Sequence, residues 1–236
     1  MRFIAGGYFL VQPRPSTEWR QQKPLLPEQF WTVDGDLCHL YPDLWGWSWT
    51  GISGEETADV KARLGQGEAA YRVMQRFVET LFEAGDIGFG GVFFDPESAR
   101  GFHHRFTSRV PDIKLLSVAL AADQIEVFLA HQPPDREKNE GEPGIRAMVR
   151  KSLAVAPAAG ERGYEVLGYD HGAFNSFAVN YLENEYVHRL GLCLKGYGLF
   201  DDYALALQAA ERTAKPTTGS EPGLWLPWKV SERNLR

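Results

Sequence analysis

Two groups of polar residues have the types that acid–base chemistry requires, and they lie far apart in the sequence. Asp170 and His171 follow the apolar stretch Tyr164–Tyr169, which has the pattern of a short strand. His103 and His104 are adjacent to each other. A carboxylate beside a histidine is a common hydrolytic arrangement. If these residues converge in a cleft, the chain is a hydrolase; otherwise Asp170 caps a helix and the histidines belong to a solvated basic helix face.

The motifs that would indicate a cofactor or a metal do not occur in the sequence. There is no GxxxxGK[ST], CxxC, HExxH or GxSxG pattern. The glycine-rich run 88–91 precedes an apolar stretch instead of opening a helix, so it lacks the setting of a dinucleotide-binding loop. We therefore expect no cofactor and no metal, and a binding protein is favoured over an enzyme.

Charge and hydropathy restrict the class of partner and the compartment. The net charge of -6 argues against binding to nucleic acid or to anionic membranes. No run of 18 or more apolar residues is present, so no transmembrane helix is expected. The start of the chain lacks the long apolar segment of a signal peptide and is predicted to be a strand. Cys38 and Cys193 are flanked by apolar residues and fit buried, reduced thiols. Together these features predict a cytoplasmic protein.

The chain divides into three parts by composition. Residues 132–144, QPPDREKNEGEPG, carry three prolines and six charged residues, and they predict an exposed loop or linker. They separate an N-terminal part, residues 1–131, from a C-terminal part, residues 145–236. The two parts form either one compact domain or two intimate subdomains.

The segment 163–191 has the clearest pattern in the chain. After the predicted strand, apolar residues recur at helical spacing, and Asp170 and Gly191 suit the two ends of a helix. We therefore expect a strand followed by a helix with one buried and one polar face. The residues of the expected buried face are Phe174, Phe177, Ala178, Tyr181, Leu182, Val187 and Leu190.

Elsewhere the pattern mixes strands with helices. Residues 70–82 form an apolar stripe closed by Gly85, Asp95-Pro96 should start a short helix, and Asp201-Asp202 should start another. A hairpin is expected at 31–40, a second at 113–131, and a helix at 145–155. The resulting fold class is α+β, with a mostly antiparallel or mixed sheet and packed helices.

Tryptophan spacing gives two alternatives at two places. Trp45, Trp47 and Trp49 lie two apart, which puts all three on one face of a strand. That face is either core or an exposed stacking platform for sugars or bases. Trp225 and Trp228 lie in an apolar tail that either docks on the domain or binds a partner.

Four short stretches resemble a pattern found in small bacterial proteins, some of them immunity proteins of polymorphic toxin systems. The stretches are Gly168-Tyr169-Asp170, Phe174-Asn175-Ser176-Phe177, Asn180-Tyr181-Leu182-Glu183 and Gly198-Leu199-Phe200-Asp201-Asp202. The resemblance implies a cytosolic protein that binds a cognate toxin and blocks it. An acidic face would speed the encounter with a basic toxin such as a nuclease. The expected contact residues are Asn180, Glu183 and Asn184 on the polar helix face, with Asp135, Glu137, Glu140 and Glu142 in the acidic loop.

Overall fold

The computed structural model describes most of the chain. The described residues are 1–12, 14–15, 27, 29–33, 62, 65, 67–88, 91–131, 144–151, 160–170, 172–178, 182, 185–192, 194, 196–220 and 222–235. The predicted hairpin turn after Val33, Trp45, Trp47, Trp49, both cysteines and residues 132–143 of the acidic loop lie outside this part.

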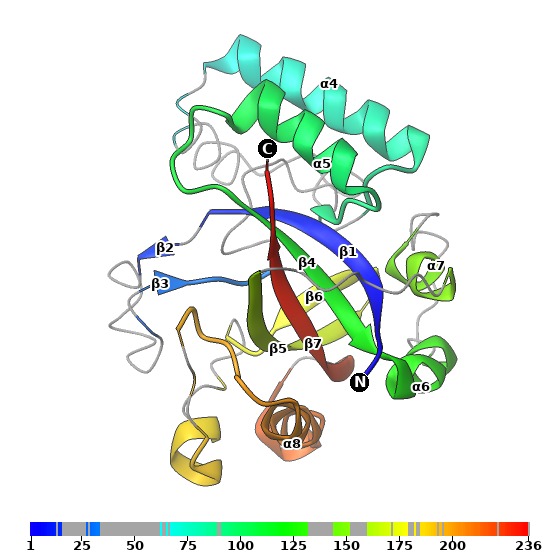
Figure 1. The fold of residues 1–236 in the computed structure, drawn as a ribbon, viewed down its shortest axis with the longest axis vertical. Coiled ribbons are helices and arrows are strands. Elements are labelled where there is room, and N and C mark those ends of the chain that lie inside the picture. Colours follow the sequence, from blue (N-terminus) through cyan, green and yellow to red (C-terminus); the bar gives the residue numbers. More distant parts are fainter. Residues whose placement is uncertain are drawn as a thin grey trace.

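A five-stranded antiparallel sheet forms the centre of the fold (Figure 1). In spatial order its strands are β1 (Phe3–Val11), β4 (Lys114–Ala121), β7 (Leu224–Arg233), β5 (Gly160–Asp170) and β6 (Ala173–Ser176). A separate pair consists of β2 (Arg14–Pro15) and β3 (Gln29–Phe30). The α+β class with an antiparallel sheet is therefore confirmed.

Helices cover both faces of this sheet. On one face, α4 (Glu68–Ala84) and α5 (Pro96–Phe102) pack near one end, and α8 (Tyr203–Thr213) packs near the other end (Figure 1). On the opposite face, α6 (Ile125–Ala130), α7 (Ile145–Arg150) and residues 31–33 enclose the largest apolar cluster. Because strand residues alternate between the two faces, β1, β4, β5 and β7 each contribute apolar side chains to both faces.

The three helices predicted from local signals are confirmed. Gly85 ends α4 in the left-handed conformation, with φ of 76°. Asp95 caps α5, since its carboxylate accepts from the Ser98 N–H at 2.9 Å. At α8 the Asp202 carboxylate accepts from the Leu205 N–H at 3.1 Å. A π-helix, His103–Thr107, continues directly from α5.

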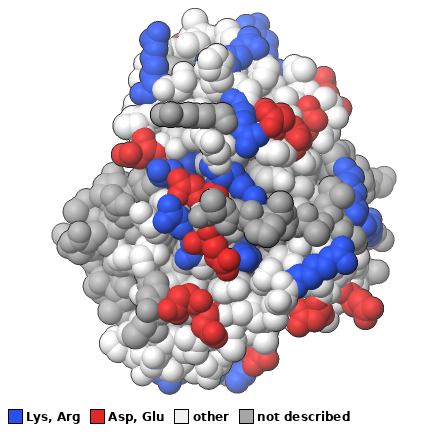
Figure 2. Space-filling view, viewed as in Figure 1, with Lys and Arg blue, Asp and Glu red and all other residues white. Residues whose placement is uncertain are grey.

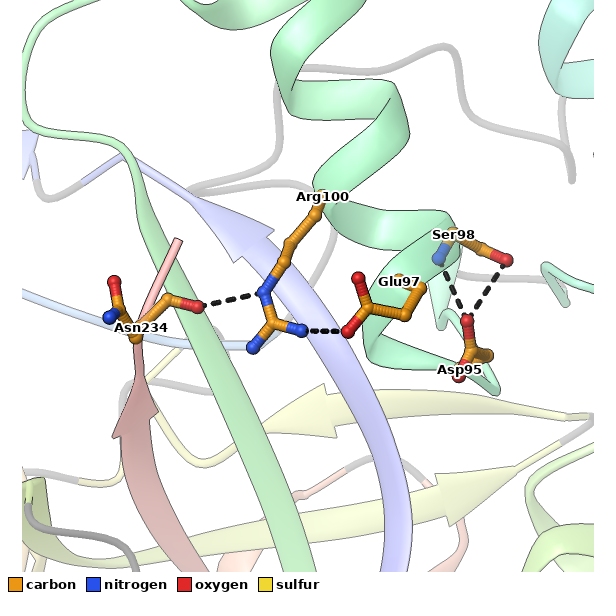
Figure 3. A network of polar contacts seen from close by, with 5 residues as sticks. All are labelled: Asp95, Glu97, Ser98, Arg100 and Asn234. Atoms are coloured by element: carbon orange, nitrogen blue, oxygen red, sulfur yellow. Dashed lines mark hydrogen bonds and ion pairs between the residues drawn. The ribbon is translucent and has the colours of Figure 1, made fainter. Parts of the chain in front are cut away.

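Arg100 of α5 contacts the backbone just beyond the end of β7 (Figure 3). Arg100 Nε donates to the Asn234 carbonyl at 3.0 Å, and Arg100 Nη1 pairs with Glu97. The expectation that the apolar tail docks on the domain is confirmed, because Trp225 and Trp228 are buried. The tail does more than dock, since it supplies the central strand of the sheet.

The predicted helix after Asp170 begins too early and is wrong over residues 173–176, which form β6. Asp170 pairs with Ala173 across a two-residue turn, and Gly172 adopts a φ of 86° that glycine tolerates. Asp170 is thus the last residue of a strand and not a helix cap. The spacing of Phe174 and Phe177 predicted that both rings lie on one buried helix face, but these two rings pack on opposite faces of the sheet.

Two predicted hairpins also differ from the structure. Residues 114–121 do form β4, but Ile125–Ala130 form helix α6, because β1 and β7 already occupy both sides of β4. The buried guanidinium of Arg146 binds the Leu129 and His131 carbonyls at 2.6 and 2.8 Å and so satisfies the end of that helix. Residues 31–33 are not a strand, although Trp31 and Val33 are buried. The helix predicted at 145–155 is confirmed for Ile145–Arg150, and it ends there with Lys151 as its C-cap.

Candidate binding surface at the rim of the sheet

Three charged side chains meet where β4, β7 and β5 run side by side. Glu232 of β7 lies opposite Leu116 of β4 and Gly160 of β5 in the strand register. Its Oε1 lies 3.4 Å from Lys114 Nζ. Its Oε2 accepts from Arg162 Nε at 3.1 Å and also contacts Nη2. We call Lys114, Arg162 and Glu232, with the rings of Trp31 and Tyr197 beneath them, the rim cluster.

An aromatic pair forms the floor under Arg162. The rings of Trp31 and Tyr197 stack with centroids 3.9 Å apart at 15°. The Arg162 guanidinium carbon lies 5.4 Å from the Trp31 ring centroid and 5.9 Å from that of Tyr197. Both contacts are within the range of cation–π attraction. The guanidinium is therefore held from below by the rings and from the side by Glu232.

Two backbone irregularities bring these groups together. A bulge in β5 between Glu161 and Gly163 leaves Arg162 outside the regular pairing with β7. Gly163 has a φ of 144°, and a Cβ there would overlap the Phe200 carbonyl. Tyr197 has a φ of 67°, which is unusual for a residue other than glycine. Its carbonyl accepts from the Trp31 N–H at 3.1 Å, which fixes the two segments together.

Charge in the rim cluster is ordered and only partly neutralised. Partial burial alone would raise the pKa of Glu232, but the Arg162 hydrogen bond and the Lys114 charge hold this pKa below its usual value. The side chains of Arg162 and Lys114 remain 39% and 33% exposed. Glu232 engages Arg162 through Nε and Nη2, and within the described part of the chain the second terminal nitrogen, Nη1, makes no hydrogen bond. The cluster thus holds two partly exposed cations around one carboxylate.

A second charged group lies on the other face of the sheet, close to α8. Lys229 Nζ pairs with Glu161 at 2.8 Å and lies 4.8 Å from the Phe3 ring centroid. The Tyr164 and Tyr203 rings contact each other edge-on at 5.5 Å. Burial, and then the charge of Asp123, raise the pKa of Tyr203 to about 12. Figure 2 shows positive and negative side chains interspersed across the middle of the face it draws.

A buried carboxylate lies inside the sheet and was not found from the sequence. Glu165 is 1% exposed, and its Oε1 accepts from the Ser176 hydroxyl at 2.8 Å and from the Thr32 hydroxyl. Its Oε2 accepts from the Val33 N–H at 3.4 Å. The signal that was available is a glutamate between the apolar residues Tyr164 and Val166 of a predicted strand. Glu165 attaches the segment that carries Trp31 to the sheet.

The predicted acid–base residues are not brought together. Asp170 lies at the end of β5, near the first residue of β7, whereas α5 packs with Leu115, which pairs with the last residue of β7. The ten residues of β7 span about 30 Å at roughly 3.3 Å per residue. His103 and His104 follow α5 directly, so they lie at the opposite end of the sheet from Asp170.

The histidine pair has a local explanation. His103 Nδ1 is 2.8 Å from the Thr107 hydroxyl across one turn of the π-helix. Burial, and then the neighbouring His104, lower the pKa of His103. His104 and Arg105 are exposed, as expected for a basic helix face. His171 lies outside the described residues, so Asp170 is the part of the predicted Asp–His pair that the structure places.

The predicted partner contacts fall outside the described part of the chain. These are Asn180, Glu183 and Asn184, and Asp135, Glu137, Glu140 and Glu142. Within the described part, no group of three or more His, Cys, Asp or Glu side chains could hold a metal ion. Among the described helices, none has the length and hydropathy needed to cross a membrane.

Comparison with protein-family models, with curated proteins and with solved structures gave no match.

Proposed function

We propose that this chain is a cytoplasmic binding protein that recognises and neutralises a cognate protein toxin, as immunity proteins do. The observation that carries the proposal is the rim cluster. Arg162 and Lys114 are both exposed in part, and both are positioned by Glu232. Arginine stacked on aromatic rings is the kind of side chain that contributes most to protein–protein interfaces.

Preorganisation makes this cluster suitable for tight binding. A free arginine loses rotamer freedom when a partner fixes it, and that loss opposes association. Arg162 is already restrained by Glu232 and by the Trp31–Tyr197 pair. A partner group that docks on it would therefore incur less of this entropic cost than it would on an isolated surface arginine.

The residues that resemble immunity proteins support the fold around this surface. Tyr169, Phe174 and Phe200 are buried, and Asp202 caps α8. Phe200 also pairs with Tyr164 through two backbone hydrogen bonds, of 2.7 and 2.8 Å. In this proposal the residues that resemble immunity proteins stabilise the region of β5 and α8. The rim cluster and the loop residues predicted from the sequence contact the partner.

The charge of the whole chain suits a basic toxin. With a net charge of -6, long-range attraction would raise the rate of encounter with a cationic protein and would weaken at high salt. The acidic loop, Asp135 to Glu142, is the proposed source of that attraction. The rim cluster would then act at short range, after the encounter.

The test is capture followed by a neutralisation assay. The tagged chain is purified from a native lysate, and any protein retained in stoichiometric amount is identified by mass spectrometry. We expect a basic enzyme that arrests growth when it is expressed alone and becomes harmless when this chain is co-expressed. If nothing is retained, or if co-expression leaves the retained protein fully toxic, the proposed function is wrong.

Neutralising the acidic loop tests where the long-range attraction arises. A variant with Asp135, Glu137, Glu140 and Glu142 changed to Asn or Gln should associate more slowly with the partner while dissociating at the unchanged rate. Stopped-flow association at two salt concentrations measures this effect. An unchanged association rate at low salt would exclude the loop as the steering element.

A further inference from the structure

We infer that Arg162 and Lys114 form a carboxylate-binding site that accepts an Asp or Glu side chain of the partner protein. This inference rests on the proposed function in one respect, namely that the protein bearing the carboxylate is the toxin. The site itself rests on the rim cluster alone. It differs from the long-range preference for a basic partner because it concerns one contact and not the total charge of the partner.

The hydrogen bonds within the cluster determine the sign of the ligand. Both carboxylate oxygens of Glu232 are engaged, Oε1 by Lys114 and Oε2 by Arg162. Lys114 has three donors and Arg162 has five, and Glu232 takes only part of this capacity. The unused groups of the cluster are therefore donors on positively charged atoms. Their natural complement is an anion with two acceptor oxygens.

The net charge of the cluster determines the class of anion. Two cations surround one carboxylate, which leaves one positive charge for the ligand. A single carboxylate matches that charge, whereas a nucleic-acid backbone would bring many negative charges to a chain whose net charge is -6. The planar guanidinium matches the geometry of a carboxylate, and the stacked rings keep it from turning away.

Both cations contact the same carboxylate, so they flank it from two sides. Lys114 lies on one side of Glu232, in β4, and Arg162 lies on the other, in β5, while Glu232 stands on the central strand β7. Three neighbouring strands fix these positions. The site is thus set by the sheet and needs no loop rearrangement to form.

The probe for this site is the peptide acetyl-tetraglutamate amide, titrated into the full, nitrogen-15-labelled chain and followed by NMR. The Trp31 indole N–H and the Arg162 Nε–H serve as reporters because both belong to the rim cluster. We expect both signals to shift with saturation, and the matched acetyl-tetraglutamine amide to leave them unchanged. Inorganic phosphate is titrated separately to distinguish a phosphate site from a carboxylate site.

Three substitutions give the result its specificity. Arg162→Ala should weaken peptide binding at least about tenfold, and Arg162→Lys should weaken it by a smaller factor because charge remains but planarity is lost. Arg72→Ala is the matched control, since Arg72 is an exposed arginine that pairs with Glu68 on α4. It should leave the affinity unchanged. Far-UV circular dichroism confirms that each variant is folded.

Several outcomes would overturn the inference. The reporter signals could stay fixed during the peptide titration, the Arg162→Ala chain could bind as tightly as the unchanged chain, or phosphate could bind where the peptide does not. The neutralisation assay separates these failures from failure of the proposed function. If the Arg162→Ala chain still binds and neutralises a captured toxin with unchanged affinity, the proposed site is wrong and the proposed function stands. If the peptide binds but no toxin is captured, the site stands and the proposed function is wrong.

Discussion

Replacing Glu165 by glutamine tests how the aromatic floor of the rim cluster is held in place. Glu165 accepts hydrogen bonds from the Thr32 and Ser176 hydroxyls and from the Val33 N–H. Thr32 and Val33 directly follow Trp31, which stacks on Tyr197 beneath Arg162. If the carboxylate anchors this segment, weakening it should destabilise the fold and loosen the rim cluster together.

The expected size of the effect follows from the geometry. Both hydroxyls donate to Oε1, so an amide oxygen in that position would keep two bonds but convert them from charged to neutral ones. Each conversion costs about 1 kcal/mol. The amide nitrogen would then face the Val33 N–H, and that buried donor would lose its acceptor at a cost of about 1 kcal/mol. We expect Glu165→Gln to lower the free energy of unfolding by about 2–3 kcal/mol.

Urea unfolding at neutral pH measures this loss, and Ser176→Ala completes a double-mutant cycle. Ser176→Ala also deprives the Ala178 N–H of its acceptor, which lies at 3.2 Å in the native structure. Because the two side chains are in contact, the double variant should lose at least about 0.5 kcal/mol less than the sum of the single losses. A Glu165→Gln chain within about 0.5 kcal/mol of the unchanged chain would refute the reasoning, and burial of Trp31 and Val33 would then account for the docking of this segment.

Three further substitutions test packing, capping and ionisation. Gly6→Ala makes a methyl group overlap the fully buried Trp228 ring. We expect this to lower the free energy of unfolding in urea by about 1–3 kcal/mol; an unchanged midpoint would contradict this packing. Asp202→Ala removes the acceptor of the Leu205 N–H and should cost about 1 kcal/mol, most of which Asp202→Asn should recover. Tyr203→Phe removes a buried hydroxyl that has no hydrogen-bond partner among the described residues and should not destabilise the fold at neutral pH. The pKa of Tyr203 is raised to about 12 in the fold. The contribution of Tyr203 to the free energy of unfolding is therefore complete below the ordinary tyrosine pKa and is lost as the pH rises through about 12. Alkaline unfolding of the Tyr203→Phe chain should lack this pH-dependent loss.

The elements that sequence predicts well are those fixed by neighbours along the chain. Helix α4 depends on an apolar stripe and on Gly85, and α5 and α8 depend on Asp95 and Asp202. Each signal acts within one or two helical turns. The order of strands is not determined by such short-range signals, because β7 is the last strand in sequence and the central one in space. Pairing between distant segments is decided by packing that a local pattern does not contain.

The β5–β6 hairpin shows how a local pattern can mislead. Phe174 packs against Trp228 with ring centroids 4.8 Å apart, whereas Phe177 packs against Phe200 on the other side of the sheet. Their spacing of three residues fits one face of a helix. Because the strand ends between them, however, the two rings lie on opposite sides of the sheet. The turn at His171-Gly172 was the competing signal, since a glycine there permits a two-residue hairpin loop.

The rim cluster could not be recognised from the sequence, and its construction explains why. Arg162 and Glu232 are separated by 70 residues, and Lys114 lies in a third strand. Their meeting depends on strand order and on the bulge that displaces Arg162, neither of which leaves a motif. The left-handed conformation of Tyr197 carries a cost of about 1–3 kcal/mol, and the structure around it must offset that cost. This residue places its ring under the partly exposed guanidinium of Arg162. The same reasoning directs mutagenesis to Arg162 in preference to Asp170, whose role as the end residue of a strand requires no such strain.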